Sequence, residues 1–212
     1  MNLAAELHDV IVAPSGFPVL SGLTLEVQVG ECLLLEGANG AGKTSALRLL
    51  GGLSTAISGH GQILGVDIAT GDRREIRRRV GWLGHEGSFY DELTVEENLT
   101  YACRLTQRPR ASIADAIERV GLGDRRATRT GLLSAGQHRR VALAWLLILR
   151  PRLWLLDEPF AALDATARAL LHEILRDATQ AGASIVMSSH EKNLEFATAP
   201  RRVTLLGGRA AS

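Results

Sequence analysis

Residues 37–44 read Gly37-Ala38-Asn39-Gly40-Ala41-Gly42-Lys43-Thr44 and match the P-loop pattern G-x-x-x-x-G-K-[ST] at every required position. The apolar run Cys32–Leu35 before them predicts a buried strand, and Ser45–Leu50 after them predicts a helix. Glycines let the backbone turn tightly and present successive N–H groups to phosphate oxygens, beside the positive end of a helix. The alternative is a glycine-rich turn that binds nothing. The strand-loop-helix context favours a nucleotide-binding site formed by residues 37–45.

Two side chains of this loop have specific roles in a nucleotide site. Lys43 is expected to reach the β- and γ-phosphates of ATP, and the hydroxyl of Thr44 is expected to bind Mg²⁺. Asp157, at the end of the apolar run Leu153–Leu156, is expected to supply the Mg²⁺ carboxylate.

Glu158 and His190 are the candidate catalytic residues. Glu158 follows Asp157 and is expected to position or deprotonate the attacking water. Adjacent acids can also form a solvated turn, but four preceding apolar residues argue against one, because unpaired charge at a buried strand end is costly. A lone histidine is usually structural. His190, however, ends the apolar run that starts at Ser184, and ligands of open α/β sheets bind at such strand ends.

The composition narrows the class of protein. The 212 residues are 46% hydrophobic, and 24 Lys and Arg against 23 Asp and Glu give a net charge of +1, so nothing indicates a nucleic-acid partner. Cys32 and Cys103 lack metal-like spacing and fit a reducing cytosol, with Cys32 packing as a small apolar residue. We expect no N-terminal targeting signal, and Val141–Leu149, the longest apolar run, is too short to span a bilayer. Any function at a membrane is therefore expected to be mediated by a partner protein.

The order of apolar segments predicts an α/β fold. Strands alternating with helices indicate a mostly parallel sheet covered on both faces. The alternation of Leu23, Leu25, Val27 and Val29 predicts a half-buried strand in a β-rich N-terminal part. Helices are predicted over residues 93–105, 112–120 and 134–149, and over 165–180 with Asp164 as its cap. The arginine-rich residues 72–79 are interpreted as a solvated helix rather than an anion site.

The run Leu133-Ser134-Ala135-Gly136-Gln137 is similar to the signature of ABC transporter ATP-binding subunits, with Ala135 where the commonest form has glycine. The P-loop, Leu153–Pro159, Ala161–Asp164 and His190 resemble further motifs of that family in the same order, so the resemblance covers nearly the whole chain. It implies the ABC-ATPase fold of P-loop NTPases, with a RecA-like parallel core, an N-terminal antiparallel β subdomain and a helical insert. It also implies one domain over residues 1–212, in which 1–85 and 150–212 form the core and 86–149 the helical signature part.

The family resemblance implies a head-to-tail dimer with ATP and Mg²⁺ between the subunits. The chain has one P-loop and one signature, so it must pair with itself or with a related subunit. Asp164 would lie in the dimer loop. The residues implied to contact the γ-phosphate on the other subunit are Ser134, Ala135, Gly136 and Gln137.

His85 departs from the family pattern, because most relatives have a glutamine there that contacts Mg²⁺ and senses the membrane partner. Imidazole is a poor ligand for so hard a cation. We retain a coupling role for this loop, with the hypothesis that His85 hydrogen-bonds to the γ-phosphate or the attacking water.

A narrower resemblance concerns the ATP-binding subunit of the haem exporter of cytochrome c maturation. The residues that carry it are Leu83-Gly84-His85, Leu133–Ala144 and Leu153–Phe160. It implies an energy-coupling ATPase bound peripherally to a polytopic membrane permease at the cytoplasmic face of the inner membrane, with no direct haem binding.

Three alternatives remain open. They are the ATPase of another small exporter of drugs, lipids or peptides, a soluble ABC protein acting on DNA or ribosomes, and a small-molecule P-loop kinase. The signature and Glu158 argue against the kinase, and the lack of a second cassette, a long coiled coil or a basic surface argues against the soluble protein. Phe17 is the one aromatic residue before the P-loop, and it either stacks on adenine or packs in the core or a turn.

Overall fold

Two β-sheets and the helices around them make up the protein. The computed structural model describes residues 3–84, 89–107, 109–161, 163–189 and 199–211. The larger sheet has six strands in the order β10-β9-β3-β8-β7-β6. Its strands are β3 (Cys32–Glu36), β6 (Val80–Leu83), β7 (Leu153–Asp157), β8 (Ser184–Ser188), β9 (Arg201–Leu206) and β10 (Arg209–Ala210).

The larger sheet is parallel except for β10, which runs antiparallel to β9. Strands β7 and β8 are buried along their whole length, as near-continuous apolar runs in a parallel sheet should be. On β3, burial raises the pKa of the Cys32 thiol to about 12, so the thiol stays neutral and packs as the apolar residue that was predicted. The α/β prediction is confirmed.

The smaller sheet is antiparallel. Its strands β1 (Leu3–Val12), β2 (Leu20–Gln28), β4 (Ser58–Ile63) and β5 (Val66–Asp67) lie in the order β2-β1-β4-β5. Leu23, Leu25 and Val27 are buried along β2, which confirms the predicted alternation. The prediction was wrong for Val29, which lies beyond the strand in the turn to β3 and is half exposed.

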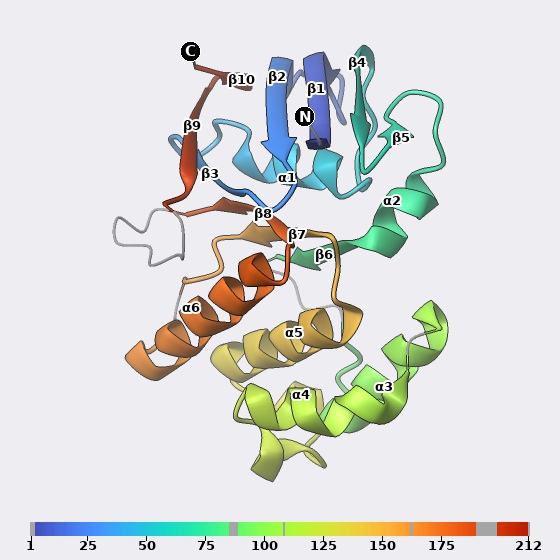
Figure 1. Ribbon diagram of the computed structural model, residues 1–212, viewed down its shortest axis with the longest axis vertical. Coiled ribbons are helices and arrows are strands. Elements are labelled where there is room, and N and C mark those ends of the chain that lie inside the picture. Colours follow the sequence, from blue (N-terminus) through green and yellow to red (C-terminus); the bar gives the residue numbers. More distant parts are fainter. Residues whose placement is uncertain (1–2, 85–88, 108, 162, 190–198, 212) are drawn as a thin grey trace.

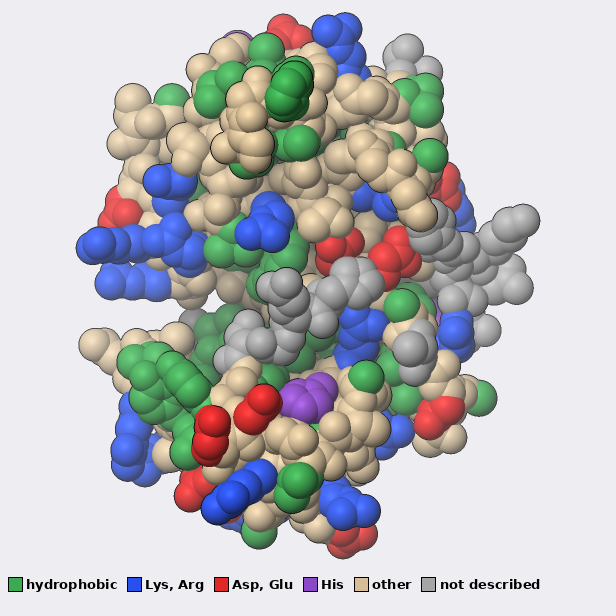
Figure 2. Space-filling view, turned by 180° about the vertical axis from the view of Figure 1, so that it is seen from behind, with side chains coloured by type: hydrophobic (Ala, Val, Ile, Leu, Met, Phe, Trp, Pro, Cys, Tyr) green, Lys and Arg blue, Asp and Glu red, His purple; other side chains and the backbone are tan. Residues whose placement is uncertain are grey.

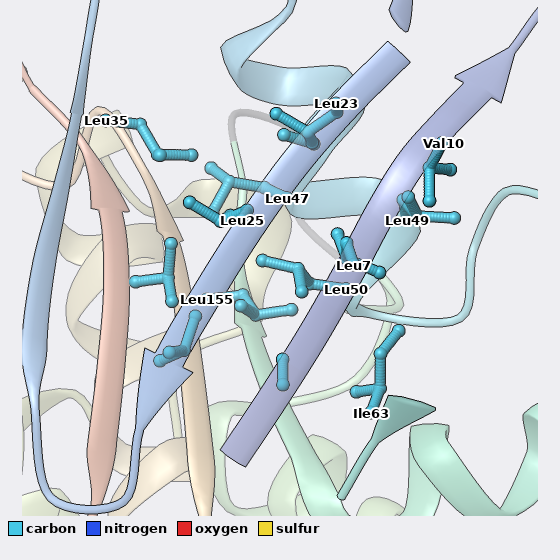
Figure 3. Close-up of a cluster of buried hydrophobic side chains, with 14 of the residues drawn as sticks. Leu7, Val10, Leu23, Leu25, Leu35, Leu47, Leu49, Leu50, Ile63 and Leu155 are labelled. Carbon is cyan, nitrogen blue, oxygen red and sulfur yellow. The ribbon is translucent and has the colours of Figure 1, made fainter. Parts of the chain in front are cut away.

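Helix α1 (Lys43–Leu50) lies between the two sheets (Figure 1). Its leucines lie in one apolar cluster together with side chains of both sheets (Figure 3). Leu47 and Leu50 of α1 are fully buried there, together with Leu7 of β1 and Leu155 of β7. The helix that follows the P-loop is therefore held by both sheets at once.

The opposite face of the parallel sheet is covered by helices. They are α3 (Val95–Thr106), α4 (Ile113–Arg119), α5 (Ala135–Leu149) and α6 (Ala165–Gln180), with short 3₁₀ turns at Arg110–Ser112, Gly123–Arg125 and Thr130–Leu132. Figure 1 shows α5 and α6 against the sheet and α3 and α4 farther from it. These helices confirm the sequence predictions closely, and Ser134 is the N-cap of α5 rather than its first residue.

In the arginine-rich helix α2 (Arg73–Arg79) Ile76 is buried, and the other residues are exposed or partly exposed. Arg79 pairs with Glu75 one turn earlier, and Arg77 donates to the carbonyl oxygen of Gly52. These contacts favour the predicted solvated helix over an anion site.

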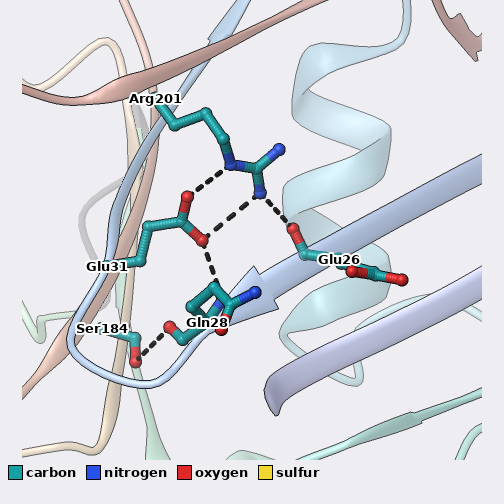
Figure 4. A network of polar contacts seen from close by, with 5 residues as sticks. All are labelled: Glu26, Gln28, Glu31, Ser184 and Arg201. Carbon is teal, nitrogen blue, oxygen red and sulfur yellow. Dashed lines mark hydrogen bonds and ion pairs between the residues drawn. The ribbon is translucent and has the colours of Figure 1, made fainter. Parts of the chain in front are cut away.

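A polar network ties the two sheets together at the amino edge of the parallel sheet (Figure 4). Arg201 of β9 donates to the carboxylate of Glu31 and to the carbonyl oxygen of Glu26. Glu31 also accepts the N–H of Gln28, and the hydroxyl of Ser184 donates to the Gln28 carbonyl at 3.2 Å. The turn from β2 to β3 is thus fixed at the end of the sheet away from the P-loop.

Asn98 organises the chain around the start of α3. Its side-chain Nδ2 donates to the carbonyl oxygens of Tyr90, Leu93 and Thr94 and to the hydroxyl of Thr130, and its Oδ1 accepts the N–H of Tyr90 at 2.8 Å. Asn98 is 2% exposed, so these partners have little access to water in its place.

We predict that Asn98→Ala lowers the free energy of unfolding by about 2–3 kcal/mol, because several buried polar groups lose their partner at once. Urea denaturation followed by circular dichroism measures the change. Thr106→Ala is the control, since it removes an exposed hydroxyl at the other end of the same helix. Equal midpoints for the two variants would contradict the role given to Asn98.

Candidate active site

The P-loop bends around glycines that no other residue can replace without strain. Gly37 has φ 139°, and a Cβ atom there would lie 2.5 Å from the carbonyl oxygen of Leu205 on β9. At Gly42, with φ 104°, a Cβ atom would lie 3.0 Å from the carbonyl oxygen of Val19. The N–H of Gly208 donates to the carbonyl oxygen of Ala41 at 3.1 Å. The loop is therefore held from outside by the β9–β10 hairpin and the entry to β2.

Lys43 is the first residue of α1 and turns its side chain back into the loop. Its Nζ donates to the carbonyl oxygens of Gly37 at 2.7 Å and Ala38 at 3.1 Å, and the residue is only 8% exposed. An ammonium group has three donors, and these bonds use two of them. The positive charge thus lies inside the loop beside the N-terminus of α1, where phosphate oxygens are attracted.

Three neighbouring strands bring one polar chain of contacts to this loop. Strand β8 lies between β3 and β7, and its Ser188 is the register partner of both Leu35 and Asp157. The buried carboxylate of Asp157 accepts from the Thr44 hydroxyl at 2.8 Å and from the Ser188 hydroxyl at 2.6 Å. The solvated-turn interpretation of the two acids is therefore wrong for Asp157, which is 3% exposed.

Glu158 leaves β7 in an unusual backbone conformation. Its φ is +48°, which non-glycine residues adopt rarely and at a cost in free energy. The conformation is held because its N–H donates to the carbonyl oxygen and the hydroxyl of Ser188, at 3.2 and 3.0 Å. Strained backbone of this kind is typical of functional positions.

The donor set around Thr44 fits Mg²⁺. Magnesium prefers oxygen ligands and is commonly held by one or two carboxylates together with substrate phosphates. The hydroxyl of Thr44 and the carboxylate of Asp157 are such oxygens, next to the loop that fits phosphate. Among the described residues no group of three His, Cys, Asp or Glu side chains could hold a metal ion, so the phosphates would have to complete this site.

The signature residues lie away from the P-loop of their own chain. Ser134 and Gln137 form a capping box at the start of α5, with N–H to side-chain oxygen distances of 3.3 and 2.9 Å. Ser134 and Ala135 are exposed, and Gly136 and Gln137 are partly exposed. Because α1 and α5 cover opposite faces of the parallel sheet, the two motifs face different surroundings. Asp164 caps α6, as predicted, by accepting the N–H of Ala167 at 2.7 Å.

Some predicted site residues are not described. His85, His190 and Ala162 of the Ala161–Asp164 loop lie outside the described residues. Phe17 is described and is 82% exposed in the turn before β2, so the interpretation as a core residue is wrong. Its turn leads into Val19, which contacts the P-loop at Gly42.

Sequence reasoning missed two residues of the site. Ser188 links Asp157 to the backbone of Glu158, and Arg139 donates to the carbonyl oxygen of Glu158 at 2.9 Å. A hydroxyl near the end of a predicted strand is common, and Arg139 is one of two adjacent arginines in α5, so neither residue stands out in the sequence. The signal that could have identified Ser188 is its place in the strand ahead of His190.

A groove lies beside the site, between α2 and α3, with a cavity volume of about 1470 Å³. Figure 2 shows the hollow at the left of the view, with basic side chains above it and hydrophobic ones below. One wall carries Arg48, Arg77 and Arg78, and the other carries Tyr90, Tyr101 and Leu105. Tyr90 and Tyr101 meet edge to face, and Leu105 is 68% exposed. Gly84 and Phe89, on either side of residues 85–88, also line it.

The sequence matches the profile of the family described as ABC transporter over residues 20–161. It is 40% identical over 178 residues to the Cytochrome c biogenesis ATP-binding export protein CcmA of Nitrosomonas europaea, covering 82% of each chain. It is 42% identical over 182 residues to the protein of the same name from Aromatoleum aromaticum, covering 84% of each. A solved ATP-binding subunit of an ABC transporter superposes with a TM-score of 0.87 at 28% identity, over 99% of this chain and 88% of that one.

We predict that Ser188→Ala lowers ATP turnover roughly 10–100-fold, the usual effect of losing a residue that orients a metal-binding carboxylate. Steady-state ATP hydrolysis by the purified protein measures it. Ser184→Ala is the matched control, because it removes a buried hydroxyl from the amino end of the same strand, far from Asp157. Comparable turnover losses in both variants would mean that Ser188 acts only through stability.

Proposed function

The chain belongs to the family of ABC transporter ATP-binding subunits, and from this premise we propose that it powers an export complex of cytochrome c biogenesis. It has the ABC-ATPase fold, it is an ATPase, and it couples ATP hydrolysis to an ABC transporter. The catalytic part of this proposal rests on the chain of contacts from Thr44 through Asp157 and Ser188 to the backbone of Glu158. It joins the phosphate loop directly to the candidate water-activating residue.

The residues of the P-loop bind the phosphates of ATP in this proposal. Backbone N–H groups of residues 37–45 surround the β-phosphate, and Lys43 neutralises the β- and γ-phosphates with the donor that remains on its ammonium group. Phe17, exposed in the turn that leads to the loop, stacks on adenine. Thr44 and Asp157 hold Mg²⁺, which supplies charge neutralisation on the phosphates when bound.

Glu158 acts on the attacking water. Its strained backbone, fixed by Ser188, sets the direction in which its carboxylate leaves the end of β7, and that carboxylate accepts the proton of the water. His190 is proposed to stabilise the γ-phosphate from the end of the neighbouring segment, and His85 to couple the loop of residues 85–88 to the membrane partner.

A second copy completes the site. The proposal places Ser134, Ala135, Gly136 and Gln137 of one subunit against the ATP of the other, with Asp164 in the loop between them. Support comes from the exposed start of α5 and from the position of α5 on the face of the sheet opposite α1. Ser134 Oγ accepts from Gln137, which leaves its own hydroxyl proton free to be donated to a phosphate oxygen.

The membrane partner is proposed to be a polytopic permease that inserts a segment into the groove between α2 and α3. The groove is contiguous with residues 84 and 89, which flank the coupling loop, and one wall is aromatic and apolar. No described helix is long and apolar enough to cross a bilayer. In this proposal the subunit lies peripherally at the cytoplasmic face of the inner membrane, and it binds neither haem nor nucleic acid itself.

The chain is proposed to be a single ATP-binding domain over residues 1–212. Residues 1–85 and 150–212 form its core, and residues 86–149 form the helical part that carries the signature. The position of α3, α4 and α5 together on one side of the parallel sheet supports this division.

We predict that Glu158→Gln keeps ATP binding but lowers turnover at least about 100-fold, because a general base is lost, and that an ATP-bound dimer accumulates. Lys43→Ala is expected to abolish productive ATP binding and with it the dimer.

Adding Ser134→Arg to Glu158→Gln is expected to remove the dimer while ATP still binds, because bulk and charge then meet the γ-phosphate of the other subunit. Size-exclusion chromatography with ATP and nucleotide-binding titrations measure these results. A dimer that survives Ser134→Arg would argue against the site shared between subunits.

We also predict that the protein, expressed with its genomic neighbours, co-purifies with a polytopic membrane protein and is released by Tyr101→Glu, which places charge in the apolar wall of the groove. Purified membranes and affinity capture measure the association. Ile57→Glu is the control, since Ile57 is an exposed apolar residue that does not line the groove. Co-purification with DNA or ribosomes instead would favour a soluble ABC protein. A partner unrelated to cytochrome c assembly would favour another exporter.

A further inference from the structure

Arg139 links the signature helix to the turn that follows Asp157. Its Nη1 donates to the carbonyl oxygens of Glu158 at 2.9 Å and Ala161 at 3.0 Å. The same turn is closed by the N–H of Ala161, which donates to the carbonyl oxygen of Glu158 at 3.1 Å. One guanidinium nitrogen therefore contacts both ends of the turn that carries the candidate base.

The guanidinium of Arg139 is partly buried and lies near two carboxylates. Burial lowers its pKa, and the nearby carboxylates of Asp157 and Glu158 act in the opposite direction. An arginine remains protonated even so. A cation that is partly removed from water is costly unless its surroundings compensate for it, and the two carbonyl oxygens and the two carboxylates do so here.

The peptide of Glu158 is held from two sides. Its N–H donates to Ser188 on β8, and its carbonyl oxygen accepts from Arg139 on α5. Its left-handed φ of +48° needs such support, because an unrestrained glutamate would leave this conformation. A displacement of α5 relative to the sheet would therefore act on the backbone from which the Glu158 carboxylate projects.

We propose that Arg139 is a positioning residue that aligns Glu158 according to the position of α5. Arg139 lies little more than one helical turn after Ser134, so the helix is rigid between them. When the start of α5 contacts the ATP of the other subunit, α5 is displaced. Arg139 transmits this displacement of α5 to Glu158 of its own subunit. The inference rests on the proposed catalytic role of Glu158 and on the shared site.

A double-mutant cycle on the purified full chain tests this role. Arg139→Met keeps the length of the side chain without its donors, and we expect kcat for ATP hydrolysis to fall roughly tenfold with KM for ATP changed less than twofold. In the Glu158→Gln background the same substitution is expected to change single-turnover hydrolysis less than twofold, because the residue through which Arg139 acts is gone. An equal fold-loss in both backgrounds overturns the proposal.

Two further variants separate positioning from general stability. Arg119→Met removes an arginine that joins α4 to α6 through Glu173 and Asp177, away from the site, and should leave kcat unchanged. Arg139→Lys keeps the cation and its donors and should restore part of the rate. If Arg139→Met fails to fold, Arg139→Lys takes its place in the double-mutant cycle. A lysine variant that folds and is as slow as the methionine variant, or a methionine variant as fast as the wild type, overturns the positioning role.

Failure of the underlying function gives a different result. If Glu158→Gln alone turns over ATP at the wild-type rate, the catalytic assignment is wrong, and the positioning role falls with it. If Glu158→Gln is slow but Arg139→Met is not, only the positioning role is lost.

Discussion

The register of β8 between β3 and β7 is the constraint on which the active site depends. It brings Ser188 level with Leu35 on one side and with Asp157 on the other, so three strand ends meet below the phosphate loop. A shift by one residue would turn Ser188 away from Asp157 and replace it with a neighbour that faces the other side of the sheet. The buried runs of these strands fix the register, because one-residue shifts would also misplace apolar side chains on both faces. Packing far from the nucleotide therefore determines geometry at the phosphates.

The helices on the two faces of the parallel sheet are held in different ways. On one face, α1 is enclosed between two sheets and cannot move without disturbing both. On the other face, α5 packs with α3, α4 and α6 in a second apolar cluster, and its direct polar connection to the active-site turn runs through Arg139. Phosphate binding is thus built on the part of the molecule that is fixed from both sides. The helix proposed to meet the partner's ATP is joined to the reacting end of the sheet by a cation and two carbonyl oxygens.

Sequence reasoning reached the fold because the patterns that predict its elements are local. The strand, glycine loop and helix around the P-loop, the apolar run that ends in Asp157, and the cap of α6 at Asp164 each express a short-range rule, and the structure has them as predicted. Val29 was misplaced because alternation continues for one residue after the strand has turned. Ser188 and Arg139 escaped notice because their roles come from contacts across 31 and 19 positions of the chain. No short-range pattern records which strand becomes the neighbour of which.

The support that the β9–β10 hairpin gives to the phosphate loop has a consequence for synthesis of the protein. Leu205 packs against Gly37, and Gly208 hydrogen-bonds to Ala41, although these partners lie 168 and 167 positions apart in the sequence. A nascent chain on the ribosome presents its glycine loop early but lacks the segment that braces it until residues 201–210 have emerged. Translation thus delays a finished nucleotide pocket, and prematurely terminated chains lack a correctly shaped one.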